Sequence, residues 1–254
     1  MAHMPRATLG WLGIAAVLAA TSAPAGLPIN TPAWVRNALS LGRSDDLHGV
    51  PNIARFVMDE GGGFVLDRSH HPAMLKFDDA PEVWALTSSR GPRGDVLFKD
   101  DVGDVLLRAT KFGGVTVFTA RRPGGAAASL VGSTSPLRLI QMGPGGLYQH
   151  MVQASVRCSR ATRHLVGFEA PDADARSAPL IADTASLAAD TLSILWGRPA
   201  DRARVSRVGK VIIARSGKLN AYVTGGALVL WVNPGAGLAG HPSSARIAKA
   251  VLGF

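Results

Sequence analysis

Hydrophobic and polar residues alternate over short stretches in the first half of the chain, and the clearest stretch runs from residue 93 to residue 119. Clusters of Asp, Lys and Gly at residues 100–103 and 111–114 divide it into three segments. Alternation bounded by such clusters is typical of β-hairpins, because strand side chains have a period of two and Asp and Gly favour turns. The pattern predicts a three-stranded meander, with several buried positions among Val96, Phe98, Leu106, Val117 and Phe118.

Similar alternating segments precede and follow the meander and are separated by turns that contain Gly or Pro. They cover residues 53–58, 64–67, 74–77, 82–86, 127–131 and 137–140. With the meander they give roughly nine short strands within about 90 residues, the spacing of a β-sandwich or a partly open barrel. The sequence therefore predicts a β-rich region over residues 53–142.

The period of the pattern changes after the Gly and Pro residues at positions 143–146. Apolar residues from Leu147 to Ala161 recur every three or four positions, which predicts a helix. Further helices are expected from residue 172 or 174 to residue 196 and over residues 245–252, with strands at 165–169, 205–214 and 227–232. The fold class is therefore α+β, with a β-rich N-terminal half and a helix-containing half over residues 147–254. The pattern does not decide whether the halves are separate domains or one compact unit.

The first 25 residues have the composition of a signal peptide. Arg6 precedes an apolar run at residues 9–20, and Ala23-Pro24-Ala25 supplies the small residues that signal peptidase reads. The run is shorter than the ~20 residues that span a bilayer, and a buried N-terminal helix is the alternative interpretation. We predict an exported protein, periplasmic or secreted, whose mature chain begins near Gly26 with an extension over residues 26–52 and has no membrane span.

Basic residues outnumber acidic ones, because 27 Lys and Arg face 18 Asp and Glu and give a net charge of +9. This charge favours an anionic envelope surface or polymer as the partner. Export and an aromatic content of only 6% argue against nucleic acid. The candidate anion-binding residues are Arg157, Arg160 and Arg163, spaced three apart on a predicted helix, and Arg246, beside the start of the last helix. A solvated basic surface is the alternative interpretation.

Asp95, Asp100, Asp101 and Asp104 form the densest acidic group of the chain, around a predicted turn. Pairs of carboxylates carry out the chemistry of many hydrolases, so these residues are the candidate catalytic groups. Calcium also prefers carboxylate oxygens, but the segment KDDVGD lacks the D-x-D-x-D-G order of a calcium loop. Turn formation explains Asp and Gly on backbone grounds alone, and we expect neither a metal nor a cofactor.

The other reactive residues give weaker signals, and no G-x-S-x-G, H-E-x-x-H, P-loop or C-x-x-C motif occurs. His70 and His71 are adjacent, so their side chains diverge in an extended segment, which suits zinc poorly. Ser243 precedes the last predicted helix and is expected to be an N-cap rather than a nucleophile. Cys158, the single cysteine, is expected to be buried, with an intermolecular disulfide as the alternative.

Four segments of the chain resemble one protein family. They are the meander pattern GD…D.G..LLRAT..GG.T.F, LYQHMVQASVRCSRATR, FEAP and HPSSARIAKA. On these residues the chain is similar to the exported bacterial family called domain of unknown function 4908, over about residues 56–251. The resemblance implies a single-module envelope protein with an N-terminal signal. It supplies no activity, cofactor or catalytic residue.

The leading functional hypothesis is a non-enzymatic binding or structural module of the envelope with a basic surface. The alternative is a carboxylate-dependent hydrolase that acts on an envelope polymer. An enzyme should bring two of the candidate acids together in a pocket with perturbed pKa values. A binding module should instead present a continuous basic or apolar patch. The sequence identifies neither the partner nor the oligomeric state.

Export predicts processing of the N-terminus. Mass spectrometry of the protein from its native host should find a chain that begins at or near Gly26, because signal peptidase cleaves after small residues. A major species that retains residues 9–20 would contradict the predicted localisation.

Overall fold

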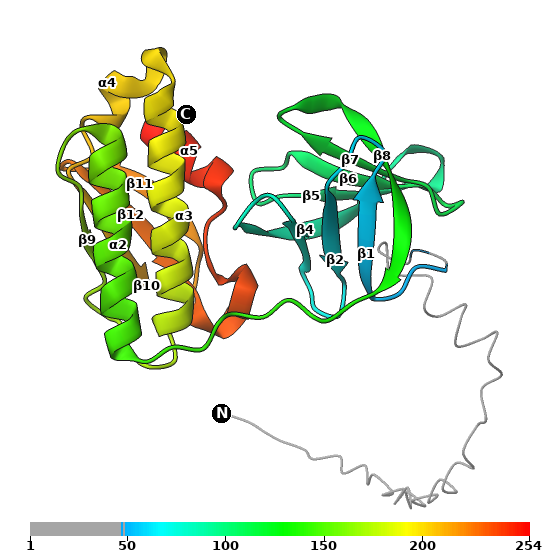
Figure 1. The fold of residues 1–254 in the computed structure, drawn as a ribbon, viewed down its shortest axis with the longest axis horizontal. Helices are drawn as coiled ribbons and strands as arrows, with labels where there is room; N and C mark the ends of the chain where they lie inside the picture. The colour runs from blue at the N-terminus through cyan, green and yellow to red at the C-terminus, as the bar shows by residue number, and fades with distance from the viewer. Residues whose placement is uncertain (1–46, 48) are drawn as a thin grey trace, which may run out of the picture. The chain divides into compact units, whose positions relative to one another are not determined.

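The computed structural model describes residue 47 and residues 49–254. The predicted signal peptide and most of the predicted extension lie outside this range. The described part consists of a β-barrel followed along the chain by an α/β layer (Figure 1). This arrangement confirms the predicted α+β class, with strands in the first half and helices in the second.

Eight antiparallel strands form a closed barrel in which each strand pairs with the next and the last pairs with the first. The strands are β1 (Ile53–Met58), β2 (Gly63–Asp67), β3 (Ala73–Phe77), β4 (Val83–Arg90), β5 (Val96–Lys99), β6 (Val105–Ala109), β7 (Val115–Thr119) and β8 (Arg122–Ser133). The predicted meander corresponds to β5, β6 and β7. Its register places Val96 opposite Ala109, and Ala109 opposite Val115.

The strand expected at residues 137–140 is wrong, because these residues connect the barrel to the next helix without regular structure. The backbone N–H of Leu137 donates to Asp67 Oδ2 (3.0 Å), and Leu139 packs against the α/β core. The barrel closes through pairing of β1 with β8. A closed barrel has no strand edge with which another segment could pair.

Side chains fill the interior of the barrel, as expected for eight strands. Phe98 and Val117 are fully buried, as predicted. Phe118 is only half-buried, because it follows Val117 and consecutive strand residues face opposite sides. Val96 and Leu106 are also partly buried. The fully buried large side chains of the barrel are Phe56, Phe64, Leu66, Leu75, Leu86, Phe98 and Leu107.

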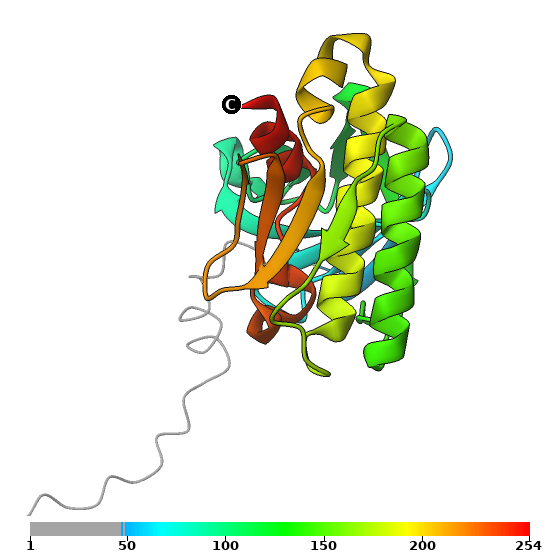
Figure 2. The same ribbon diagram turned by 90° about the vertical axis from the view of Figure 1, so that its left-hand side faces the viewer.

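The second half is a four-stranded sheet in the order β11-β12-β10-β9, with α2 and α3 side by side on one face (Figures 1 and 2). β10 is parallel to both β9 and β12, and β11 is antiparallel to β12. The elements are α2 (Pro144–Thr162), β9 (Gly167–Glu169), α3 (Ala178–Gly197), α4 (Arg202–Val205), β10 (Lys210–Arg215), β11 (Asn220–Thr224), β12 (Ala227–Val232) and α5 (Ser244–Leu252). Short 3-10 turns are η1 (Pro92–Gly94), η2 (Pro199–Asp201) and η3 (Pro234–Gly240).

The three expected helices correspond to α2, α3 and α5. The strand expected at residues 205–214 begins only at Lys210, because η2 and α4 occupy the residues before Ser206. Sequence reasoning misses β11, since Asn220 and the four residues after it show no strict alternation and follow Gly217.

α3 is the central helix of the second core and buries side chains such as Ile181, Ala185 and Leu192. Among the described residues it alone is long and apolar enough to cross a membrane, and 72% of its most apolar segment is buried inside the protein. Such burial is typical of a core helix. Cys158 of α2 is buried in the same core, as predicted, and this burial raises the pKa of its thiol to about 12.

Phe98 tests the assignment of the barrel interior. Phe98→Ala should lower the free energy of unfolding by ~3–5 kcal/mol through lost transfer energy and a new cavity. The matched control is Phe118→Ala, which should cost clearly less because its ring lies outside the barrel and is half-buried. Urea denaturation measures both values. Equal costs would show that the register of this strand region is shifted by one residue.

Candidate functional site

The four candidate acidic residues have different hydrogen-bond partners in the structure. Asp95 is buried, and its Oδ2 accepts a hydrogen bond from Arg108 Nε (2.6 Å). Asp100 Oδ1 accepts from the backbone N–H groups of Val102 (3.0 Å) and Asp104 (2.8 Å), so Asp100 stabilises the turn. Burial raises the pKa of Asp100, although these two donors oppose the shift. The side chain of Asp104 is exposed.

Asp101 contacts the last helix instead. Its carboxylate accepts from Ser243 Oγ and, at 2.6 Å, from Arg246 Nε. Ser243 Oγ also accepts the backbone N–H of Arg246 (3.1 Å), so Ser243 is the N-cap of α5 as expected. Arg246, a candidate anion-binding residue, is therefore bound within the chain. Residues 47 and 49–254 contain no group of three or more His, Cys, Asp or Glu that could hold a metal ion.

The three candidate arginines of α2 and its C-terminus are exposed, opposite the buried residues of the helix. Arg157 Nη2 lies 3.6 Å from Asp190 Oδ1 of α3. Arg163 follows the last turn in the left-handed conformation (φ 56°). In the described part of the chain, neither Arg160 nor Arg163 forms an ion pair with a carboxylate. These two residues therefore present unneutralised positive charge to solvent.

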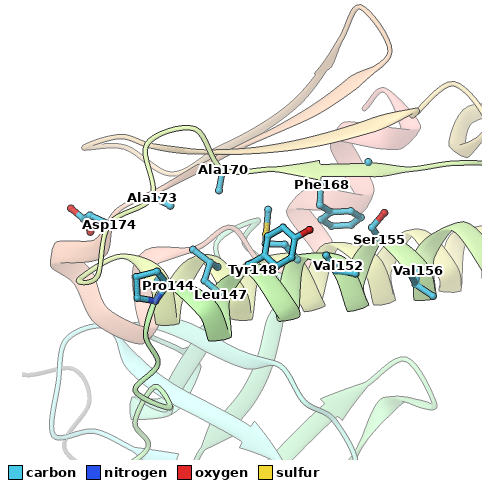
Figure 3. Close-up of a pocket in the computed structure, with 13 residues that line it drawn as sticks. Pro144, Leu147, Tyr148, Val152, Ser155, Val156, Phe168, Ala170, Ala173 and Asp174 are labelled. Carbon is cyan, nitrogen blue, oxygen red and sulfur yellow. The ribbon is translucent and has the colours of Figure 1, made fainter.

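An open groove of about 510 Å³ runs between α2 and the segment from β9 to the start of α3 (Figure 3). The residues of α2 that line it are Pro144, Leu147, Tyr148, Met151, Val152, Ser155 and Val156. The residues of the facing wall are Gly167, Phe168, Ala170, Ala173, Asp174 and Ala178. Four of these six are Gly or Ala, whose side chains are too short to reach α2. The groove therefore stays open, and the apolar side chains on its α2 wall are not covered by the facing wall.

Two serines fix α2 to the strand region at one end of the groove. Ser155 Oγ donates to the carbonyl oxygen of Val166 (2.7 Å), and Ser159 Oγ accepts from the N–H of Val166 (2.9 Å). These bonds hold the start of β9 against the C-terminal half of α2. In Figure 3, Ser155 and Phe168 lie at this end, and Asp174 lies at the opposite end beside Pro144.

Asp174 closes the opposite end with polar contacts. It accepts hydrogen bonds from the N–H (2.8 Å) and the Oγ (2.7 Å) of Ser177, and it forms an ion pair with Arg215 of β10. The hydrogen bonds from Ser177 and the Arg215 guanidinium lower the pKa of Asp174 to about 2. The groove therefore runs from an ionised carboxylate paired with arginine to Ser155 and Val156 of α2, and the two unpaired arginines follow these residues along the chain.

Sequence reasoning misses this groove. Beside the core stripe of α2, a second apolar stripe consists of Tyr148, Val152 and Val156, spaced four residues apart. Tyr148 is 71% exposed, Val152 43% and Val156 41%. An apolar stripe that lies next to the core stripe marks surface beyond what the core can bury. That second stripe is the signal in the sequence that could have revealed the site.

A family model described as domain of unknown function (DUF4908) matches residues 35–251, most of the chain. The chain belongs to this family. The match confirms the resemblance seen in the sequence. No curated protein and no solved structure matches this DUF4908 protein. The family description assigns no activity, so the function has to be argued from the geometry.

A buried carboxylate joins the barrel of the DUF4908 protein to α5. Glu82, which sequence reasoning also misses, accepts from the N–H (2.8 Å) and the Oγ (2.5 Å) of Ser244. Glu82 and Asp101 thus place two carboxylates at the first turn of α5, where the helix dipole favours negative charge. Burial raises the pKa of Glu82, against the opposing effect of the hydrogen bonds from Ser244.

His241 is buried just before α5. Its Nδ1 lies 3.0 Å from the carbonyl oxygen of Pro242, and its Nε2 lies 3.3 Å from Asp183 Oδ2. Burial acts to lower the pKa of His241, but the Asp183 carboxylate and the Pro242 carbonyl outweigh it and the net shift is upward. The folded DUF4908 chain therefore favours the charged imidazolium.

The two raised pKa values give stability the same dependence on pH. His241 contributes stability below its ordinary pKa of 6.5, and that contribution is lost as the pH rises through the higher pKa of the folded state. The raised pKa of Glu82 also lowers stability as the pH rises. This loss begins at its ordinary pKa of 4.5, because the unfolded chain ionises there while burial opposes ionisation in the folded chain.

We expect the free energy of unfolding, measured in urea, to fall as the pH rises from about 6 to about 8, below the range in which the Cys158 thiol ionises in the unfolded chain. His241→Gln should flatten this dependence, whatever it does to stability at any single pH. His70→Gln, which changes an exposed histidine, is the matched control and should leave the dependence intact. An unchanged slope in His241→Gln would contradict the pairing of His241 with Asp183.

Proposed function

We propose that this protein binds a long-chain anionic amphiphile, with the apolar chain in the groove and the acidic headgroup at Arg160 and Arg163. The observation that carries the proposal is the open apolar groove of about 510 Å³ against a helix whose charged side chains are all basic. The expected export supports it, because the envelope is bounded by membranes. The leading hypothesis from the sequence is a non-enzymatic module that binds an anionic partner, and an amphiphile is the chemical class of partner proposed here.

An apolar chain suits the walls of the groove. Leu147, Met151 and Phe168 line it, and few of the lining residues carry polar side-chain atoms. Ser155 Oγ, one of those atoms, is already bonded to Val166. Each buried methylene would contribute about 0.8 kcal/mol, which is roughly a fourfold gain in affinity.

Charge places the headgroup at the C-terminal end of α2. Arg160 follows Val156 by four residues, so both side chains lie on the same side of the helix, one turn apart. Side chains of a helix lean toward its N-terminus, which directs Arg160 back toward the groove. Arg163 adds a second charge at the end of the helix. Two full positive charges outweigh the roughly half negative charge of a helix C-terminus.

The other end of the groove is less favourable for an anion. Arg215 neutralises Asp174 there, so the remaining charges are the roughly half positive charges of the α2 and α3 N-termini. The end at Arg160 and Arg163 retains about one and a half positive charges after its dipole is counted. The difference orients the ligand with its chain toward Asp174.

An extended peptide that pairs with β9 is the competing occupant, because β9 is an edge strand. β9 has three residues, and the N–H of Gly167 donates to the carbonyl of Gly209 on the β10 side. Backbone groups alternate along a strand, so Phe168 is the residue of β9 whose N–H and C=O face the open edge. One residue supplies too few main-chain bonds to hold a peptide, and the amphiphile is favoured.

The test is a displacement assay in which linear carboxylates of increasing length compete with a fluorescent fatty acid for the full chain. Affinity should rise roughly fourfold per methylene until the groove is filled. Ala170→Phe, which fills the groove, should remove this dependence on length. Arg160→Gln with Arg163→Gln should weaken the binding of carboxylates by about 25-fold at low salt and leave the binding of a fatty alcohol unaffected.

The matched control is Arg198→Gln with Arg207→Gln, which removes two exposed charges outside the groove lining. Equal losses in the two double variants would show attraction by net charge alone and would contradict the headgroup site. Unchanged binding in Ala170→Phe would place the ligand elsewhere. Binding of extended peptides without binding of amphiphiles would favour strand addition at β9.

A further inference from the structure

The loops of the barrel separate into two ends. The register places Arg90, Val96, Ala109 and Val115 in one row across β4, β5, β6 and β7. The β4–β5 and β6–β7 loops begin beyond this row, so they lie at one end of the barrel, which we call the basic end. The loops of the opposite end cover residues 59–62, 78–82, 100–104 and 120–121.

The carboxylates of the barrel gather at the opposite end. Eight of the ten Asp and Glu between residues 49 and 133 belong to its loops: Asp59, Glu60, Asp78, Asp79, Glu82, Asp100, Asp101 and Asp104. The two others, Asp67 and Asp95, are buried. The basic end exposes Arg90, Arg93 and Lys111. The exposed side-chain charges of the loops at this end are therefore positive. At the opposite end, which we call the acidic end, Asp78, Asp79 and Glu60 are paired with Arg55, Arg121 and Arg122.

An aromatic ring stands among these basic side chains. Phe112, in the β6–β7 loop, is 87% exposed. Lys111 Nζ lies 4.9 Å from the centre of the Phe112 ring. A Cβ atom placed on Gly94 would lie 3.8 Å from Lys111 Cδ, so the two loops of the basic end are in contact.

We propose that the basic end of the barrel docks on an anionic lipid bilayer, with the Phe112 ring among the headgroups and Arg93 and Lys111 against the lipid phosphates. Exposed aromatic rings flanked by Lys and Arg are typical of residues at a membrane surface. The proposal does not rest on the groove, which is in the other half of the chain.

The partner is a bilayer rather than a soluble anion because of Phe112. A soluble phosphate or acidic polymer would use Arg93 and Lys111 and leave the ring in water, whereas a bilayer interface buries the ring. The acidic end is less suited to this role, because its arginines are paired with Asp78, Asp79 and Glu60. Glu82 and Asp101 of this end are bound to α5. The distribution of charge between the two ends therefore favours the orientation in which the basic end of the barrel faces the bilayer.

The test places a dye at the tip of the loop. Cys158 is buried and its thiol has a pKa of about 12, so a maleimide dye reacts selectively with a cysteine introduced at the surface. Phe112→Cys and, as the matched control at the acidic end, Asp59→Cys in the exposed loop of residues 59–62 are labelled in the full chain. Each is mixed with vesicles that contain anionic phospholipid or phosphatidylcholine alone. The N-terminal residues are the same in both variants, so the position of the dye reports the docking surface.

The emission of the dye at position 112 should shift to the blue on anionic vesicles, and the dye at position 59 should not respond. Arg93→Gln with Lys111→Gln should weaken the response about 25-fold at low salt, or about fivefold per charge, and less at high salt because of screening. Phe112→Ala in the unlabelled chain should reduce flotation with vesicles about tenfold.

Three results would overturn the proposal. They are an equal shift at both positions, an equal response to neutral vesicles, and no shift at position 112. A blue shift at position 112 with polyaspartate but not with vesicles would assign the basic end to an acidic polymer instead. Circular dichroism confirms that each variant is folded before its binding is compared.

Discussion

Two hydrogen bonds to one residue determine where the groove lies. Ser155 and Ser159 hold Val166, and with it the start of β9, against α2. Beyond this point the wall that faces the helix is built mainly from Gly and Ala, so the outer apolar stripe of α2 has nothing to pack against. Apolar burial is the dominant favourable term in folding. The apolar surface in the open groove is not buried by the chain itself. A ligand that covers this surface would therefore gain the same favourable free energy of burial.

The carboxylates of the barrel have partners within the chain. Asp95 is paired with Arg108, and Asp101 and Glu82 bind the first turn of α5, where the helix dipole favours them. The attachments of Asp101 and Glu82 to α5 are at the acidic end of the barrel, away from the loops of the basic end. The same distribution of charge thus joins the two halves of the protein and gives the barrel one basic end.

The alternation in the sequence predicts most barrel strands because it reports which side of a strand faces the core. It misplaces residues 137–140, whose pattern resembles that of a strand, because closure depends on the pairing of β1 with β8, more than 70 residues apart. The groove is beyond prediction for a similar reason. The stripe of Tyr148 and Val152 is readable, but whether it is covered depends on Ala170 and Ala173, which only the fold brings opposite α2.

The central claim is that the groove holds the chain of an amphiphile, and nuclear magnetic resonance tests it most directly. With an isotopically labelled long-chain carboxylate bound to the protein, the claim predicts nuclear Overhauser effects between the chain methylenes and the methyl groups of Met151, Val152 and Val156. The terminal methyl of the ligand should contact Ala173, near the Asp174 end. Contacts confined to residues outside the groove, or a terminal methyl beside Arg160, would contradict the account.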